Sequence, residues 1–181
     1  MNTIKKTYEE KGYVLIKGLI SPEICQQSKI STSKLNSKLT IPFSKVPYGF
    51  GDVRKSYPYS EIANSKSIHK MAQDLISNEV KMSHFLLVNK AAWIGPEVEW
   101  HQEVFNLQIY APGCDAKKEW KNFLQVFIAL DKHDKINGCL KVFEGSHNEG
   151  ILDYEDIVNT NCSHKRRVTV DALNKLSKKY Q

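Results

Sequence analysis

The chain has 181 residues, of which 41% are hydrophobic and 25% are charged, and its net charge is +6. This length and composition predict one water-soluble globular domain that spans residues 1–181. The sequence contains no apolar run near the roughly 20 residues that cross a bilayer, and its N-terminus has no apolar signal segment. We therefore expect no membrane partner and a cytoplasmic location.

The positive charge is spread along the chain apart from two basic clusters, at 164–167 and 175–180. Neither cluster is interleaved with aromatic residues that could stack on bases, so we expect solvated basic segments and no nucleic-acid partner. The four cysteines are far apart and form no CxxC pair. This pattern indicates reduced cytosolic thiols and not a disulfide framework.

The first part of the chain is predicted to contain a strand, a helix, a loop and a second helix. Residues 13–20 are a β-rich run, which predicts a strand. Residues 21–23, Ser-Pro-Glu, supply an N-cap, a proline at N1 and an acid in the first turn, so a helix is expected to follow. Residues 33–60 are polar and interrupted by proline and glycine, which indicates a long loop or lid. Residues 67–77 have helical spacing of apolar side chains.

The second part of the chain is predicted to be mainly β. Short apolar or aromatic runs, separated by turn residues, occupy 80–93, 98–110, 123–131 and 139–147. Asn137-Gly138 lies between the last two runs and is a strong hairpin signal. Several short strands with turns between them favour a sandwich or a barrel. A final helix is expected after residue 169, with Leu173, Leu176 and Tyr180 on one face.

The run that begins at residue 98 carries the residues with the clearest chemistry. In a strand, side chains alternate between faces, so His101 and Glu103 would point the same way and Gln102 the other way. One imidazole, one carboxylate and a second histidine from elsewhere make the facial triad of non-haem Fe(II) oxygenases. The alternative for the same residues is a polar outer face with no metal.

Three segments of the chain resemble the phytanoyl-CoA dioxygenase-like family. They are, in order, "YEEKGYVLIKGLISPEIC", "VNKAAWIGPEVEWHQEVF" and "QVFIALDKHDKINGCLKVFEGSHNEG". The resemblance covers nearly the whole chain, and its combination of WHQ, NGCL and GSH is specific. It implies a double-stranded β-helix, a jelly-roll or cupin-like fold that is mainly β with flanking helices. It also implies an oxygenase that uses Fe(II) and the co-substrate 2-oxoglutarate.

The resemblance further implies roles for particular residues. His101 and Glu103 match the histidine and aspartate of the family's WHQD segment, which bind iron; here glutamate replaces aspartate. The extra methylene moves the carboxylate, whereas a metal site tolerates only small displacements of its ligands. Lys90 and Gln125 fall on strands expected beside the iron, where either could bind the 2-oxoglutarate carboxylates or face solvent. His147 of the GSH motif matches a structural residue.

The sequence after His147 departs from the family pattern. The family's third iron ligand is a histidine several tens of residues after GSH, followed by an arginine that pairs with 2-oxoglutarate. The only histidine here after His147 is His164, whose surroundings do not match that segment. His164 with Arg166 and Arg167 is an alternative, but these basic neighbours would repel Fe(II). We therefore expect a fold that is incomplete at its C-terminus, with open strand edges.

Two functions remain open from the sequence. The first is an oxygenase that hydroxylates a small metabolite or a lipid-derived substrate, with residues 33–60 forming a lid over the substrate. The second is a catalytically inactive, truncated relic or a binding module that keeps the same scaffold. A nucleic-acid-binding domain is supported by charge alone.

Overall fold

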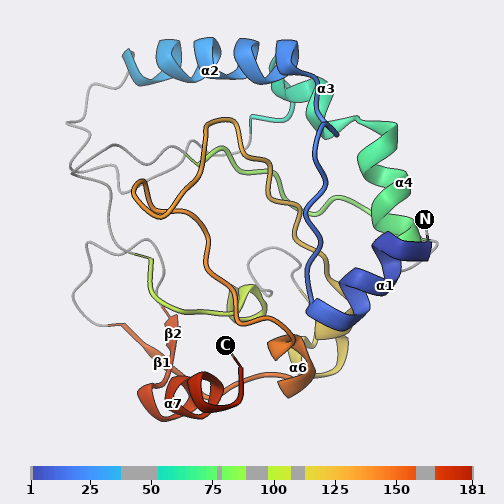
Figure 1. Cartoon of the computed structure of the whole chain (residues 1–181). Coiled ribbons are helices and arrows are strands. Elements are labelled where there is room, and N and C mark those ends of the chain that lie inside the picture. Colours follow the sequence, from blue (N-terminus) through green and yellow to red (C-terminus); the bar gives the residue numbers. More distant parts are fainter. Residues whose placement is uncertain are drawn as a thin grey trace.

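A computed structural model of the chain describes residues 2–37, 53–76, 79–88, 98–106, 113–157 and 166–180. The elements described are α1 (Asn2–Lys11), α2 (Pro22–Ser37), α3 (Tyr59–Ala63), α4 (Lys66–Leu75), η2 (Glu103–Asn106), α6 (Ala116–Glu119), η3 (Trp120–Asn122), η4 (Ser146–Glu149), β1 (Tyr154–Asp156), β2 (Arg166–Val168) and α7 (Val170–Lys179). Helices α2, α3 and α4 lie at one end of the molecule, and β1, β2 and α7 lie at the other (Figure 1). Elongated segments run between these two ends.

The helix predicted from residues 21–23 is confirmed as α2. The hydroxyl of Ser21 accepts a hydrogen bond from the amide of Ile24 (3.2 Å), as expected for an N-cap. The helix runs on to Ser37, so the loop prediction is wrong for residues 33–37. Extending a formed helix adds one hydrogen bond per residue without a new nucleation cost, which favours this polar continuation. Residues 38–52 of the predicted lid lie outside the described residues.

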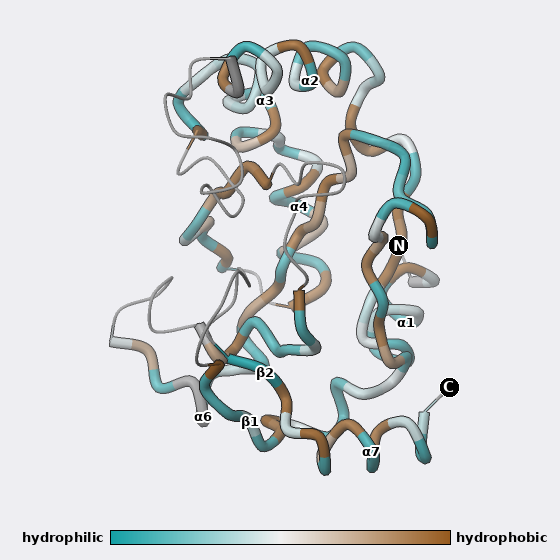
Figure 2. Tube along the Cα trace, turned by 90° about the vertical axis from the view of Figure 1, so that its left-hand side faces the viewer, coloured by the Kyte–Doolittle hydropathy of each residue, from teal (hydrophilic) through white to brown (hydrophobic). Residues whose placement is uncertain are grey.

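The two other predicted helices are also confirmed. Helix α4 begins after Ser65, whose hydroxyl accepts from the amide of Ile68 (3.4 Å). Helix α7 begins after Thr169, whose hydroxyl accepts from the amide of Ala172 (3.3 Å). Hydrophilic and hydrophobic residues alternate along α7, as its predicted amphipathic spacing requires (Figure 2). In both helices a capping side chain and a periodic apolar pattern agree, and these signals are local.

The strands differ from the prediction. In the described part of the chain the sheet consists of β1 and β2, which pair antiparallel with Glu155 opposite Arg167 and Asp156 opposite Arg166. Residues 13–20 form an unpaired stretch and a turn, so the strand prediction there is wrong. Each of the two arginines pairs with its opposite carboxylate, at 2.7 Å for Arg167 and 3.1 Å for Arg166, and both side chains stay partly exposed to solvent.

The turn at Asn137-Gly138 is confirmed, while its flanking strands are not paired. Gly138 has a φ of 78°, and the side chain of Asn137 accepts from the amide of Asp134 (2.8 Å). The flanking runs 123–129 and 139–143 carry no assigned strand. A double-stranded β-helix therefore stays a prediction for this chain.

Two groups of side chains are buried, one at each end of the molecule. At the end with α2 and α3, the side chains of Tyr59 and Ile62 are 1% and 5% exposed. The Tyr59 hydroxyl donates to the main-chain carbonyl of Ser28 (3.2 Å) and so ties α3 to α2. At the other end a hydrophobic core forms from Phe105, Val168 and Ala172, with Val104, Ile151, Leu152 and Leu173 packed against it. This second core lies beside the predicted metal ligands.

Candidate metal centre

The structure brings His101 and Glu103 together where the chain turns into η2. Nε2 of His101 lies 3.3 Å from Oε1 of Glu103, and Nδ1 lies 2.7 Å from the main-chain oxygen of Glu99. The two side chains therefore share a face, as predicted. The strand prediction is wrong for residues 103–106, because the backbone enters a 3-10 helix at Glu103.

The hydrogen bonds of His101 determine where its protons lie. A carbonyl oxygen can only accept, so Nδ1 carries a proton and donates it to Glu99. In the neutral ring Nε2 is then an acceptor, and it faces a carboxylate oxygen of Glu103, which is also an acceptor. A proton shared by the two groups satisfies this contact, and a metal ion bound by both atoms would replace that proton.

The surroundings of His101 raise its pKa. Burial disfavours the imidazolium and lowers the pKa, but the hydrogen bonds with Glu103 and with the Glu99 carbonyl, together with the charge of Glu103, raise it above 6.5. The pair thus stabilises a cation at Nε2. A metal ion at this position would compete with that proton.

The spacing of the two donor atoms fits adjacent positions around one metal ion. Two neighbouring ligand atoms of an octahedral ion, each about 2.1 Å from the metal, lie about 3 Å apart. The 3.3 Å between the two side chains is close to this value. The extra methylene of Glu103 is accommodated because the carboxylate turns back toward the imidazole. Among the described residues no three His, Cys, Asp or Glu side chains are grouped to hold a metal, so the structure supplies two donors.

One side of this segment is held by Gln102. Its amide nitrogen donates to the main-chain oxygen of Gly150 (2.8 Å), and its amide oxygen accepts from the amide of Leu152 (2.9 Å). Gln102 was predicted on the face opposite the two donors, without a role of its own. Its partners lie 48 and 50 residues away, and no local signal in the sequence identifies them.

Another side of the segment is held by β2. The amide of Val168 donates to the main-chain oxygen of Trp100 (2.8 Å), and Nη1 of Arg166 donates to that of Phe105 (2.7 Å). The ring of Phe105 lies 4.4 Å from the ring of Tyr154 in β1, centroid to centroid. Hydrogen bonds from β2, one from a main-chain amide and one from the Arg166 side chain, therefore lie on either side of the two donor residues.

The other predicted site residues are not brought to this pair by any contact described. Gln125 is exposed in the stretch 123–129, while Lys90 and His164 lie outside the described residues. Arg166 and Arg167 are close to the segment but are engaged with carboxylates. The role of Lys90 and Gln125 in binding 2-oxoglutarate stays a prediction.

His147 has a structural position, as the resemblance implied. Its Nε2 donates to the main-chain oxygen of Glu9 in α1 (3.0 Å). A Cβ on Gly12, which has a φ of 80°, would lie 2.5 Å from Nδ1 of His147. The imidazole thus fills the space left by this glycine and connects α1 to η4.

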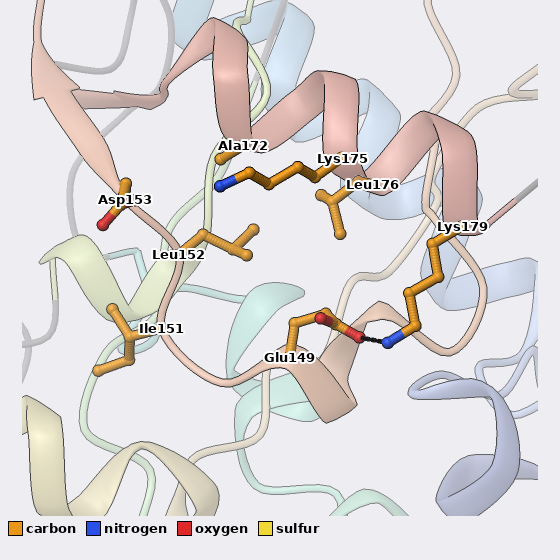
Figure 3. A pocket seen from close by; sticks show the side chains of 8 residues that line it. All are labelled: Glu149, Ile151, Leu152, Asp153, Ala172, Lys175, Leu176 and Lys179. Carbon is orange, nitrogen blue, oxygen red and sulfur yellow. Dashed lines mark hydrogen bonds and ion pairs between the residues drawn. The ribbon is translucent and has the colours of Figure 1, made fainter.

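A pocket of about 210 Å³ lies behind the segment that anchors Gln102. Figure 3 shows it between α7 and the stretch 149–153, with the Lys175 side chain extended between them. The lining residues are Glu149, Ile151, Leu152, Asp153, Ala172, Lys175, Leu176 and Lys179. It is separate from the His101–Glu103 pair, since none of its lining residues belongs to that segment.

Comparison with known proteins gives one match. The family model described as Phytanoyl-CoA dioxygenase (PhyH) matches residues 8–171, which is most of the chain. Neither a curated protein nor a solved structure matches. In the part of the chain that the structure describes, no helix has both the length and the apolar character needed to cross a membrane. Members of the matched family are in general oxygenases that use Fe(II) and 2-oxoglutarate. The chain belongs to the phytanoyl-CoA dioxygenase family.

Proposed function

We propose that this chain is an Fe(II)- and 2-oxoglutarate-dependent oxygenase that hydroxylates a small metabolite or a lipid-derived substrate. His101 and Glu103 are the two protein ligands of its iron that the described residues contain. The observation that carries the proposal is the facing pair of acceptors, Nε2 and Oε1, 3.3 Å apart, with Nδ1 committed to the Glu99 carbonyl. Nε2 and Oε1 are both atoms that bind divalent metals, and they lie close enough to bind one ion together.

In this proposal each residue has a defined task. Iron, when bound, activates oxygen for the oxidation of a C–H bond, coupled to decarboxylation of 2-oxoglutarate. Glu99 orients the imidazole of His101 so that Nε2 points at the metal position, as carbonyl partners do for metal-binding histidines. Glu103 supplies the negative charge beside it.

The proposal extends to the co-substrate and to the fold. Lys90 and Gln125 are the candidates for the 2-oxoglutarate carboxylates. Arg166 and Arg167 are weaker candidates, because the bonds to Asp156 and Glu155 would have to be exchanged for bonds to the co-substrate. We also infer a double-stranded β-helix as the scaffold, on the basis of family membership and the alternating apolar runs after residue 80.

The first experiment is a titration with Mn(II), a redox-stable substitute for Fe(II), followed by calorimetry. We expect one bound ion per wild-type chain, and affinity at least about 100-fold weaker in His101→Ala and Glu103→Ala. The reason is that removing groups that only orient metal ligands already costs about 10- to 100-fold. His69→Ala, which changes an exposed histidine of α4, is the matched control and should bind as the wild type does.

A second measurement separates the enzyme from the inactive alternative. Consumption of 2-oxoglutarate in the presence of Fe(II) and oxygen should be detectable in the wild type and lost in His101→Ala. Metal binding without this consumption would favour the inactive relic or binding module. Equal Mn(II) binding by wild type and His101→Ala would contradict the iron site itself.

A further inference from the structure

Gln102 lies between the two proposed metal ligands in the sequence. Both the nitrogen and the oxygen of its side-chain amide form hydrogen bonds. Nε2 donates to the Gly150 oxygen (2.8 Å), and Oε1 accepts from the Leu152 amide (2.9 Å). We propose that Gln102 is a positioning residue that directs His101 and Glu103 to the same side of the chain. This inference rests on the proposed function, because it concerns the same metal site.

The two hydrogen bonds resemble those between neighbouring strands. A residue in a paired strand offers one N–H and one C=O to its neighbour, and the carboxamide of Gln102 offers the same two groups to residues 150 and 152. Because the partners are one carbonyl and one amide, only one of the two orientations of the carboxamide satisfies both. The side chain is therefore held in a single orientation.

The anchor for Gln102 is itself held in place. Leu152 packs against the core of Phe105, Val168 and Ala172, and its side chain lies beneath α7 (Figure 3). Gly150, with a φ of 73°, ends η4 in a conformation that favours glycine. Movement of Gln102 therefore requires both hydrogen bonds to break or the packed stretch to shift.

Anchoring Gln102 has a direct effect on its two neighbours. With Gln102 bonded to the 150–152 stretch, the side chains before and after it, the second at the first residue of η2, share the other side of the chain. His101 and Glu103 meet there, with 3.3 Å between Nε2 and Oε1. Without the two bonds the segment would still be held by β2 at Trp100 and Phe105, but His101 and Glu103 would lose the anchor that lies between them.

The test is to compare Mn(II) affinity in the wild type and in Gln102→Met, a variant of similar length that makes neither hydrogen bond. We expect affinity to fall about 10- to 100-fold, the range found when groups that orient ligands are removed. Hydrogen exchange at the Leu152 amide should accelerate in the same variant, since its acceptor is lost. Gln26→Met, at an exposed position of α2, is the control and should change neither quantity.

Each outcome decides the inference. Wild-type affinity in a folded Gln102→Met overturns it. If Gln102→Met does not fold, Gln102→Asn, which keeps the amide but is one methylene shorter, takes its place with the same expectations. Failure of both variants to fold would assign Gln102 to stability alone and would also overturn the inference. Loss of binding in His101→Ala together with intact binding in Gln102→Met refutes only this inference, whereas a wild type that binds no Mn(II) refutes the proposed function.

Discussion

The segment that carries the proposed iron ligands and the elongated runs that cross the middle of the molecule differ in how they are held. The first segment, 98–106, is bonded to β2 and to the 150–152 stretch, and its Phe105 is 6% exposed. In the runs 81–88, 123–129 and 139–143 several large hydrophobic side chains are 43% exposed or more, although Leu87 is only 6% exposed. Examples are Phe127 at 49%, Val142 at 54% and Leu140 at 64%.

Among the described residues, the contacts that hold the two ligands come from β2, the 150–152 stretch and the core around Phe105. A few long-range contacts to main-chain atoms and one small core hold His101 and Glu103 in place. The elongated runs have the composition of strands, and the apolar surface that they expose is the kind that a neighbouring element buries. The three changes below test how far the two regions really differ.

The largest expected effect is on the free energy of unfolding, when a phenylalanine is replaced by alanine in each of the two regions. Phe105→Ala removes a buried ring from the core and should lower the free energy of unfolding by about 3–5 kcal/mol. Phe127→Ala removes a half-exposed ring and should cost about 1 kcal/mol or less. Urea denaturation of both variants measures these values. Equal losses would show that residues 123–129 are as well packed in solution as the ligand segment, and the comparison would fail.

An intermediate effect is expected where α1 meets the turn that follows residues 139–143. Gly12→Ala places a Cβ 2.5 Å from Nδ1 of His147, at a residue whose φ is 80°. The positive φ alone costs about 1–2 kcal/mol, and the contact with the imidazole adds to it. Gly18→Ala has a similar φ but open space around its Cβ, so only the backbone cost should appear.

Thermal denaturation of these variants checks the expectation. The Tm should fall more in Gly12→Ala than in Gly18→Ala, and adding His147→Ala to Gly12→Ala should recover part of the loss. A Tm for Gly12→Ala no lower than that of Gly18→Ala would mean that His147 does not fill the space beside Gly12.

The smallest effect is expected at the edge of the packed region. Glu149 accepts hydrogen bonds from Lys179 (2.6 Å) and from the hydroxyl of Tyr180. The bond from Lys179 contributes most, and the two together hold the pKa of Glu149 below 4.5. A carboxyl with a lowered pKa stabilises the folded state above its ordinary pKa, and this stabilisation is lost as the pH falls through the folded-state value. Glu149→Gln should therefore lower the Tm slightly at pH 7 and less at pH 3. A difference that grows on acidification would contradict the assignment.

The parts of the fold that sequence patterns predicted are those with local causes. The helix after Ser21 was predicted from its N-terminal cap, and the helices near residues 67–77 and after Thr169 from their apolar repeats; all three are present and begin with a capping hydroxyl. The strand at 13–20 was predicted from composition, but a strand needs a partner, and composition does not specify one. For the same reason the hairpin signal at Asn137-Gly138 located a turn and not a sheet.

The candidate site was predictable to the same extent. The spacing of His101 and Glu103 was enough to predict that they share a side, because that depends on neighbours in the chain. The supports of the site were not predictable. Gln102 contacts residues 48 and 50 positions away, and Arg166 bonds to a main-chain oxygen 61 positions away. Arg166 and its neighbour look like a solvated basic cluster in the sequence, and only the pairing of β1 with β2 places carboxylates opposite them.

The turn at Gly145 has a consequence for how the molecule would respond to mechanical load. The amide of Gly145 donates to the main-chain oxygen of Lys11 (2.9 Å), at the end of α1, and a Cβ on Gly145 would lie 3.3 Å from the ring of Tyr180. The end of α1 and the residue that follows α7 thus both contact the turn at Gly145. Under tension applied between residues 2 and 180, this junction would bear the force first. The ligand segment 98–106 would carry little of this force until the contacts of Gly145 with Lys11 and Tyr180 had broken.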